Sequence, residues 1–442
     1  MSGTPEGPAL GREGPPLTVC VVGLGKIGLP LAVQCAAAGG MRVIGCDIDA
    51  SVVEAINRGE TEIGEPGLAE ALRDAVGAGT LWASTDTTAG SMEADVVIVI
   101  VPVAVTGGFE VDFRHIDSAA AAVGAGLRRG ALVVFESTLP VGSTRKRLVP
   151  LLERGAELTA GVDFAVAFSP ERVYSGRIFS DLAAYPKVVG GIDLASTNRA
   201  AEFYGQLLRA PVLSLGSCEA AEYVKLVETT YRDVNIALAN EFALYAERLG
   251  LDVGEVIAAA NTQPFSHVHQ PSVGVGGHCI PVYPYFLINS WDGFRIPPLA
   301  RAINDGMAAH AVRMLEAALG TLVGQTVLIL GLTYRENVKE VSFSSATKIV
   351  LELRRRGATV LGHDPLLSDG EQRALGVQPV ALDAVPGVAA IVLQAPHDAY
   401  RALDYATFSG LRAFLDGRAA LEADAVAALG ARGVRYVRVG LG

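Results

Sequence analysis

The sequence contains little cysteine, and nothing in its pattern ties the cysteines together. There are five cysteines in 442 residues, an odd number, and no C-x-x-C pair. This usage indicates a reducing compartment, and it argues against both a disulfide framework and a thiol-type zinc ribbon. The five are Cys20, Cys35, Cys46, Cys218 and Cys279.

The sequence also lacks an excess of basic residues and any long apolar run. Its formal net charge is −11, whereas a nucleic-acid-binding surface needs basic clusters that neutralise phosphates. The longest apolar run, residues 96–105, is too short to cross a bilayer, and we interpret it as a buried parallel strand. No secretory signal is visible, so we expect a cytoplasmic protein with no nucleic-acid partner and no membrane partner.

Apolar residues, in contrast, are abundant and regularly placed. Half of the residues are hydrophobic and 19% are charged, which is typical of a folded globular chain. From residue 17 onward, strand patterns alternate with helical patterns, which cover residues 27–38 and 50–58. Strands separated by helices predict an α/β fold with a parallel, doubly wound sheet. The strand patterns are LTVCVVGLG, MRVIGCDID, ADVVIVIVP and ALVVFEST.

After a long helical stretch, the second half of the chain again shows strand patterns that alternate with helical ones. Residues 219–250 contain no proline and no internal glycine, and their apolar residues recur at helical spacing. We interpret them as one long helix that forms a spine and an oligomer contact; an ordinary helix packed on the sheet is the alternative. Beyond Gln325, TVLILGLTY, ATVLGHDP and VAAIVLQAP predict a second, degenerate α/β nucleotide-binding unit.

We therefore predict four segments and an α/β fold class. Two doubly wound Rossmann-like domains are joined by a central helical region that contains one long helix. The first segment is rich in glycine and proline, and we interpret it as a disordered tail. The segments are residues 1–16 (tail), 17–212 (first Rossmann domain), 213–320 (central helical domain with a catalytic loop) and 321–442 (second Rossmann-like domain).

The stretch GLGKIG, residues 23–28, fits the G-x-G-x-x-G pattern of a dinucleotide-binding turn. Because the chain has 50 glycines, the match alone is weak. It gains weight because it follows a strand, opens a helix and precedes a second strand that ends in Asp47 about twenty residues further on. That geometry places a pyrophosphate on the helix N-terminus and a ribose on Asp47. An aspartate would repel a 2′-phosphate, so we predict NAD rather than NADP; a glycine turn without a ligand is the alternative.

Cys279 lies in the loop GGHCIP, residues 276–281. The glycines permit close approach of a substrate or a metal, and Pro281 stiffens the exit of the loop. A thiolate here could attack an aldehyde to form a thiohemiacetal, from which a hydride can leave to NAD⁺ and yield a thioester. An inert buried thiol is the alternative.

Three of the seven histidines stand close to this cysteine in the chain: His267, His269 and His278. Such a cluster could indicate zinc or iron. No carboxylate nearby offers an obvious further ligand, and the first two histidines alternate as they would along a strand or loop edge. We therefore expect surface or packing histidines and no metal.

In order along the chain, these motifs resemble the nucleotide-sugar dehydrogenase family, the UDP-glucose/GDP-mannose 6-dehydrogenases, whose members make uronic acids. The resemblance extends from Val19 to the last strand. The segments RDVNIALANE and GGHCIP are most similar to the branch that acts on UDP-N-acetylmannosamine or UDP-N-acetylglucosamine. The motifs are VVGLGKIGLPLA, GCDID, ESTLPVGST, FSPERVYSG, EAAEYVKLVETTYRDVNIALANE, SVGVGGHCIPVYPYFL and GLTYRENVKE.

The resemblance implies an NAD-dependent oxidation of the C6 alcohol of a UDP-sugar, or a related nucleotide sugar, by two successive hydride transfers. Cys279 would trap the intermediate aldehyde and then carry the thioester. Glu171 would activate the hydrolytic water, Thr138 would help to hold that water, and Lys225 would stabilise the oxyanion. Viewed without the resemblance, Lys225 could be a solvated helix lysine and Glu171 a helix-capping acid.

The resemblance also implies which segments and residues bind ligands. It assigns NAD to residues 17–212, a homodimer contact to residues 213–320 and the nucleotide sugar to residues 321–442. The candidate catalytic residues are Cys279, Lys225, Glu171, Thr138 and Thr229. The candidate NAD-binding residues are Gly23, Gly25, Lys26, Ile27, Gly28, Asp47 and Thr138. The candidate substrate-binding residues are Glu171, Arg172, Lys225, Gly276, Gly277 and Tyr334.

Four positions depart from the family pattern. Tyr283 replaces an aspartate four residues after the cysteine, and Thr229 replaces an asparagine four residues after the lysine. Phe265 and Ser342 align with two arginines. Tyrosine, with an ordinary pKa of about 10, cannot act as a carboxylate base near pH 7, and loss of an acid–base group lowers a rate on the order of 10²–10⁴-fold. Two alternatives follow: a homologue that stops at the aldehyde or oxidises another position, and a non-catalytic partner that binds NAD and a nucleotide sugar.

Overall fold

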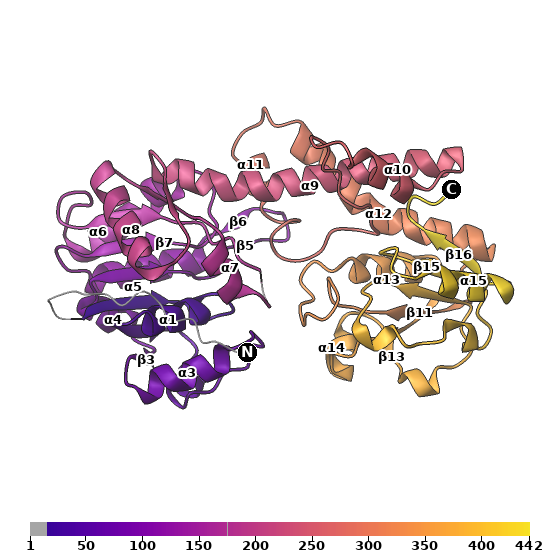
Figure 1. Cartoon of the computed structure of the whole chain (residues 1–442), viewed down its shortest axis with the longest axis horizontal. Helices are drawn as coiled ribbons and strands as arrows, with labels where there is room; N and C mark the ends of the chain where they lie inside the picture. Colours follow the sequence, from indigo (N-terminus) through magenta and orange to yellow (C-terminus); the bar gives the residue numbers. More distant parts are fainter. Residues whose placement is uncertain (1–15, 175) are drawn as a thin grey trace. The chain divides into compact units, whose positions relative to one another are not determined.

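The computed structural model describes residues 16–174 and 176–442 (Figure 1). The tail predicted for residues 1–16 therefore lies outside the described residues, except for its last residue. Within the described ranges, no helix combines the length and the apolar character that a membrane-spanning segment needs. The chain divides into two compact units: unit 1 comprises the chain up to Glu228 with Tyr285–Ser290, and unit 2 comprises Thr229–Pro284 and Trp291–Gly442.

Unit 1 contains an eight-stranded sheet. In spatial order its strands are β10 (Val212–Ser214), β9 (Lys187–Gly191), β8 (Ala165–Phe168), β7 (Leu132–Phe135), β4 (Val96–Val99), β1 (Leu17–Val22), β2 (Met41–Cys46) and β3 (Leu81–Ser84). Strands β3, β2, β1 and β4 have the order of a Rossmann sheet. The register of β1 and β2 runs from Leu17 opposite Met41 to Val22 opposite Cys46.

Helices cover both faces of this sheet. Because successive strand residues point to opposite faces, Val19 and Val21 of β1 join one core, whereas Cys20 and Val22 join the other. Burial on both faces explains why the strands are almost continuously apolar. The helices of unit 1 are α1 (Gly28–Ala37), α2 (Ala50–Asn57), α3 (Leu68–Gly77), α4 (Thr87–Glu93), α5 (Arg114–Gly126), the π-helix η1 (Thr144–Leu148), α6 (Val149–Ala156), α7 (Ile178–Ala184), α8 (Leu194–Leu207) and α11 (Pro284–Ile288). The first residue of α11, Pro284, is assigned to unit 2, and the rest of this helix to unit 1.

The strand predicted over residues 96–105 is wrong in its second half. Strand β4 ends at Val99, and Pro102, which has no N–H to donate, cannot continue a central ladder. Beyond it the chain leaves the core: Ala104 is exposed, and Ala104–Val105 (β5) pairs antiparallel with Val111–Asp112 (β6).

The first sheet also departs from a wholly parallel arrangement. Strand β9 runs antiparallel to β8, with Phe168 opposite Gly190. Among the described residues of the connection between them, 169–174 and 176–186, the helical segment is the seven-residue helix α7. This reversal brings the start of β9 to the edge of the sheet at which β8 ends.

The long helix predicted over residues 219–250 is confirmed. Helix α9 (Cys218–Leu249) is one uninterrupted helix of 32 residues that begins in unit 1 and ends in unit 2 (Figure 1). Gly250, with a φ of 68°, ends it in the left-handed region that favours glycine. Small residues of its second half, Ala239 and Ala243, are buried in the core of unit 2.

Unit 2 contains a six-stranded parallel sheet in the Rossmann order 3-2-1-4-5-6. Its strands in spatial order are β13 (Gln378–Pro379), β12 (Thr359–His363), β11 (Thr326–Leu330), β14 (Ala390–Leu393), β15 (Ala413–Asp416) and β16 (Arg435–Arg438). Its helices are α10 (Val253–Ala260), α12 (Ile296–Leu319), α13 (Ser345–Arg355), α14 (Asp369–Ala374), α15 (Ala423–Ala431) and the 3₁₀ turns η2 (Leu382–Ala384), η3 (Asp398–Tyr400) and η4 (Tyr405–Thr407). Two cores, one on each face, confirm the predicted second doubly wound region.

In each sheet, the second strand of the fold is followed by an aspartate that holds the glycine turn. Asp47 Oδ2 accepts the N–H of Leu24 at 2.8 Å, and Asp364 Oδ2 accepts that of Leu332 at 2.7 Å. Asp364 is only 2% exposed and also contacts His397 Nε2 at 3.1 Å, whereas Asp47 is half-buried. Burial works against ionisation of Asp364, but the hydrogen bonds from His397 and from backbone N–H groups outweigh it and lower its pKa to about 2.

Replacing this buried carboxylate should destabilise unit 2. We expect Asp364→Asn to lower the free energy of unfolding by about 2 kcal/mol at pH 7, because His397 and the backbone donors lose a charged acceptor. The pKa of Asp364 in the folded state lies below the ordinary 3.8, so its contribution is complete above about pH 4 and is lost as the pH falls toward 2. Urea denaturation of the full chain at pH 7 and at pH 3 measures both effects.

Asp369→Asn is the matched control, because Asp369 is an exposed aspartate in the first turn of α14. It should change the free energy of unfolding by less than about 0.5 kcal/mol. Equal losses in the two variants, or an Asp364→Asn loss that persists undiminished in acid, would contradict the prediction.

Candidate active site

The turn GLGKIG connects β1 to α1 and leaves one side open. Gly23 has a φ of 94°, and a Cβ on Gly28 would lie 1.8 Å from the carbonyl oxygen of Gly23, so both positions require glycine for the turn itself. A Cβ on Gly25 would meet no atom within 4 Å. Glycine at this position is therefore not explained by packing within the protein, but it is explained by a ligand that approaches the backbone closely.

The surroundings of this turn fit a dinucleotide. The N-cap residue of α1 is Ile27, whose side chain cannot accept a hydrogen bond from the first helical N–H groups. Those groups, with the exposed Lys26 beside them, suit a pyrophosphate. The half-buried carboxylate of Asp47 suits a ribose hydroxyl. The residues predicted for the cofactor thus lie around one turn, except Thr138, which follows β7 and is buried.

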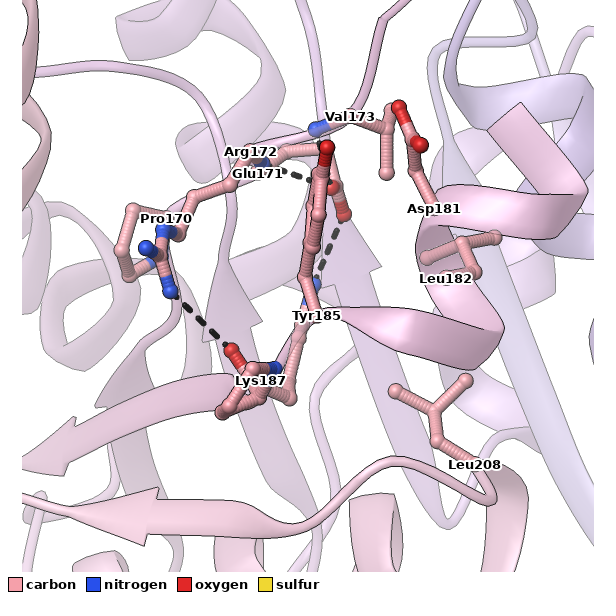
Figure 2. A pocket seen from close by; sticks show the side chains of 10 residues that line it. Pro170, Glu171, Arg172, Val173, Asp181, Leu182, Tyr185, Lys187 and Leu208 are labelled. Atoms are coloured by element: carbon pink, nitrogen blue, oxygen red, sulfur yellow. Dashed lines mark hydrogen bonds and ion pairs between the residues drawn. The ribbon is translucent and has the colours of Figure 1, made fainter. Parts of the chain in front are cut away.

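Glu171 lies in the loop after β8, in a small pocket of unit 1 with room for about one water molecule (Figure 2). Its Oε1 accepts the N–H groups of Arg172 (2.6 Å) and Val173 (3.1 Å), and its Oε2 lies 2.8 Å from Lys187 Nζ. Lys225 Nζ donates to the main-chain oxygen of Glu171 at 2.6 Å. The pocket is lined by Pro170, Glu171, Arg172, Val173, Asp181, Leu182, Tyr185, Pro186, Lys187 and Leu208.

The environment of Glu171 favours its ionised form. Burial raises the pKa of this carboxyl, but the ammonium of Lys187, the backbone N–H of Arg172 and the charge of Lys225 together outweigh burial. The net result is a pKa below the ordinary value of 4.5. A buried carboxylate that stays ionised can accept a proton or orient a water molecule.

Arg172 and the loop that follows Thr138 have contacts in unit 1 that bear on the predicted roles of these two residues. Arg172 forms an ion pair with Glu228 and donates to the Pro186 carbonyl oxygen at 3.2 Å. Glu222, on α9, accepts the N–H groups of Gly142 and Thr144 and so holds the loop that follows Thr138. Burial raises the pKa of Glu222 to about 7, although hydrogen bonds from Thr144 partly offset the effect.

Unit 1 also contains site residues that sequence reasoning missed. Lys187 and Glu136 are buried beside Glu171, and Tyr204 donates a hydrogen bond to Glu136. Two signals were available in the sequence. Glu136 is the first residue of the quoted ESTLPVGST motif, and Lys187 is a charged residue that begins a buried apolar strand.

The loop of Cys279 belongs to unit 2. Gly277 has a φ of 87° and donates its N–H to the Ser342 carbonyl oxygen at 2.9 Å. A Cβ on Gly276 would lie 2.8 Å from Tyr334 Cβ, and one on Gly277 would lie 3.1 Å from the ring of Tyr334. The structure thus brings Gly276, Gly277 and Tyr334 together. Cys279, two residues further, is partly exposed.

The predicted catalytic residues divide between the units. Thr138, Glu171 and Lys225 belong to unit 1, whereas Cys279 belongs to unit 2. Thr229 is the first residue of unit 2 and lies one turn beyond Lys225 on α9, on the same face of the helix.

Two of the positions that depart from the family pattern, Tyr283 and Phe265, lie in unit 2 and differ in their contacts. The N–H of Tyr283 donates to the Cys279 carbonyl oxygen at 2.9 Å, and Phe265 is 88% exposed.

Within residues 16–174 and 176–442, no three His, Cys, Asp or Glu side chains gather in a group that could hold a metal ion.

Comparison with known proteins decides the family. The chain matches the NAD binding domain of the UDP-glucose/GDP-mannose dehydrogenase family over residues 17–208, its central domain over 219–305 and its UDP binding domain over 328–423. The UDP-N-acetyl-D-mannosamine dehydrogenase of Pyrococcus horikoshii is 36% identical over 394 residues, 88% of this chain and 91% of that protein. This chain belongs to the UDP-glucose/GDP-mannose dehydrogenase family. As a family member it is an NAD-dependent oxidoreductase of the nucleotide-sugar dehydrogenase type, and the predicted family, enzyme class and cofactor are confirmed.

Solved structures of UDP-glucose/GDP-mannose dehydrogenases confirm the fold. UDP-D-ManNAc dehydrogenase from Pyrococcus horikoshii matches with a TM-score of 0.88 at 34% identity, covering 96% of this chain and 100% of that chain. A UDP-glucose dehydrogenase from Pyrobaculum islandicum matches with a TM-score of 0.85 at 30% identity, covering 98% and 100%. The predicted α/β class with two Rossmann-like domains is therefore correct.

Two glycines of the turn should respond differently to alanine. Gly25→Ala should fold like the wild type but bind NAD⁺ at least about tenfold more weakly, because its Cβ would occupy the open side of the turn. Gly28→Ala should lose both thermal stability and NAD⁺ binding, because its Cβ collides with Gly23. Calorimetric titration with NAD⁺ and thermal unfolding measure these effects.

Gly77→Ala on α3 is the control, since its Cβ would enter open space on an ordinary helix. It should leave NAD⁺ binding unchanged and stabilise the fold by about 0.5–1 kcal/mol. Undiminished NAD⁺ affinity in Gly25→Ala would show that the open side of the turn does not receive the pyrophosphate.

Proposed function

We propose that this dehydrogenase oxidises the C6 alcohol of a UDP-sugar to a carboxylate in two successive oxidations, with Cys279 as the nucleophile. The observation that carries the proposal is Glu171, a buried carboxylate with a lowered pKa whose main chain is bound by the ammonium of Lys225. The match to a UDP binding domain supports a UDP-sugar. The names of the relatives support UDP-N-acetyl-D-mannosamine as the first candidate.

In this proposal, residues 23–28 and Asp47 hold the cofactor. The backbone of Gly23, Gly25 and Gly28 and the start of α1, with Lys26 and Ile27, would receive the pyrophosphate. Asp47 would receive a ribose, and Thr138 is the remaining residue that we assign to NAD. When bound, NAD⁺ supplies the acceptor for the electrons that leave C6. Asp47 would repel a 2′-phosphate, which favours NAD⁺ over NADP⁺.

The first chemical task of the protein is to trap the C6 aldehyde. The Cys279 thiolate bonds to C6, and the carbonyl oxygen takes the electron pair as an oxyanion. The Lys225 ammonium and the Thr229 hydroxyl stabilise that charge by donating hydrogen bonds. Oxidation of the resulting thiohemiacetal leaves C6 as a thioester on Cys279.

The second task is hydrolysis of the thioester. Glu171 takes a proton from water as the water oxygen bonds to C6, and Thr138 helps to hold that water. The carbon–sulfur bond then breaks, the electron pair returns to sulfur, and the sugar leaves as a carboxylate. Because Glu171 must be ionised for this step, a low pKa keeps the step active in mildly acidic solution.

The remaining assignments concern substrate binding and assembly. We assign Arg172, Gly276, Gly277 and Tyr334 to the sugar nucleotide, supported in unit 2 by the packing of Tyr334 on the two glycines. We keep the domain boundaries at residues 17–212, 213–320 and 321–442, with the nucleotide of the substrate bound by the last.

We also propose a homodimer through α9. Five large apolar residues between its middle and its C-terminal end are exposed, and their spacing of seven, four, three and four places them on one face of the helix. Such a stripe on a long helix is suited to pack against a second copy of itself. The residues are Tyr231, Leu238, Phe242, Tyr245 and Leu249.

The stoichiometry of the reaction tests the chemistry. With UDP-N-acetyl-D-mannosamine, we expect two NADH per sugar consumed and a uronate product. Cys279→Ser should lower formation of that product at least about 10²-fold, because no thioester can form. Cys218→Ser, at a buried cysteine that takes part in no step, is the control and should keep the stoichiometry.

Other outcomes of this assay point to the alternatives. One NADH per sugar in the wild type would mean that the reaction stops at the aldehyde, as the phenol of Tyr283 in place of a carboxylate would allow. NAD⁺ binding without turnover on any UDP-, dTDP- or GDP-sugar would indicate the non-catalytic partner. Full activity of Cys279→Ser would exclude the thioester.

The dimer can be tested separately. Leu238→Glu combined with Phe242→Glu should convert the protein to a monomer in sedimentation analysis, because two carboxylates in a closed apolar face cannot be solvated. Leu351→Glu, at an exposed leucine on α13, should leave the assembly unchanged. A dimer that survives the double substitution would place the contact elsewhere.

A further inference from the structure

A buried ammonium bridges two carboxylates in unit 1. Lys187 Nζ lies 2.8 Å from Glu171 Oε2 and 3.1 Å from Glu136 Oε2, and the side chain of Lys187 is only 5% exposed. Glu136 is fully buried and also accepts the hydroxyl proton of Tyr204, whose ring lies under the ammonium with its centroid 4.9 Å from Nζ. Nothing in the proposed chemistry uses Lys187, Glu136 or Tyr204.

The sheet topology brings these residues to one edge. Glu136 and Glu171 follow the carboxyl ends of β7 and β8, which are parallel neighbours. Because β9 is antiparallel to β8, with Phe168 opposite Gly190, the same register continued beyond the paired residues places Lys187 opposite Glu171. A parallel β9 would begin at the far edge of the sheet, and its first residue could not reach Glu171.

The charges of the cluster do not balance. One ammonium faces two buried carboxylates, so full ionisation leaves a net negative charge away from water, which is costly. Burial and the neighbouring Glu171 raise the pKa of Glu136 to about 7, although Lys187 works against this. Glu171 has the opposite shift, because its backbone donors and Lys225 add to the effect of Lys187. The proton that the cluster retains near neutral pH therefore resides on Glu136.

We propose that Lys187 is a positioning residue that holds Glu171 ionised and aimed into its pocket, and that Glu136 anchors Lys187 in that place. The inference rests on the proposed role of Glu171 as the base that activates water. Tyr204 and Lys187 fix Glu136 from two sides, and Lys187 in turn fixes Glu171 Oε2, while its Oε1 is fixed by two N–H groups of its own loop.

All charged and titratable groups around the cluster enter the expected pH response. Burial raises the pKa of Tyr204 and of Cys35 on α1, so both are neutral over the working range. Arg172 faces Glu228, and Asp181 of α7 accepts the N–H of Tyr174. The charged and titratable groups around the cluster are Tyr204, Cys35, Lys225, Arg172 with its partner Glu228, Asp181 and Tyr185.

Only a change that removes the cation should move the acidic limb of the kcat–pH profile. Glu136→Gln replaces a carboxyl that is already protonated on this limb and keeps an acceptor for Tyr204, so its limb should stay where it is in the wild type. Lys187→Met removes the cation, so the limb should move to higher pH by about one unit or more, with an approximately tenfold lower rate at a pH on the limb. Lys187→Arg should restore the wild-type limb.

Lys339→Met is the matched control, because Lys339 is an exposed lysine that pairs with Glu371 in unit 2. Its profile should equal that of the wild type. If Lys187→Met does not fold, Lys187→Gln decides, since it also removes the charge but keeps a hydrogen-bond donor for Glu171 Oε2. A purely structural ion pair predicts lower thermal stability with an unmoved limb in the Lys187 variants, and that result would overturn the inference.

Glu171→Gln separates this inference from the function on which it rests. If Glu171 is the base, the variant should accumulate a covalent uronoyl adduct on the acid-quenched protein, detectable by mass. Rapid hydrolysis of the adduct in Glu171→Gln would refute the proposed role of Glu171 and the inference with it. Accumulation of the adduct, together with an unmoved limb in Lys187→Met, would refute the inference alone.

Discussion

Both sheets are buried on both faces, and this constraint decides where polar chemistry can occur. A residue in the middle of a central strand of either sheet packs into one of two apolar cores, so a charged side chain there would be left without water. The carboxylates of the two sheets are accordingly found at or just beyond the ends of strands. Asp47, Glu136 and Glu171 in unit 1 and Asp364 in unit 2 all follow the last residue of a strand. The parallel order of the strands then gathers those of each unit along one edge of its sheet.

The two units use the same device at this edge but differ in what the carboxylate faces. Asp47 and Asp364 each accept the N–H that follows the glycine of a strand-to-helix turn. Asp364 also accepts hydrogen bonds from His397 and from further backbone N–H groups inside the protein. It is therefore a structural group, and its pKa is about 2. Asp47 is half-buried and can still meet a ligand. A difference in burial, rather than in residue type, separates the carboxylate proposed to bind the cofactor from the structural one.

Most of the fold could be predicted from patterns within short segments of the sequence. The apolar strands, the turn at residues 23–28 and the uninterrupted helix α9 depend on residue spacing within short segments, which is why they could be predicted. The extended strand over residues 96–105 was wrong because an apolar run does not reveal where burial ends, and Pro102 breaks the ladder. The direction of β9 was missed for a related reason, since strand direction depends on how a connection packs and not on the strand's own residues.

The sequence by itself determined the class of fold, the glycine turn proposed for NAD, the family and the identity of the candidate catalytic residues, because each depends on residue type and spacing along the chain. Only the tertiary structure decided the surroundings of those residues. Glu136, Glu171 and Lys187 lie far apart in the sequence, after β7, after β8 and at the start of β9. The reversal of β9 nevertheless places the ammonium of Lys187 between the two carboxylates. The ionisation of Glu171 follows from that contact, because a charge buried from water is governed by its neighbours in space rather than by its neighbours in sequence.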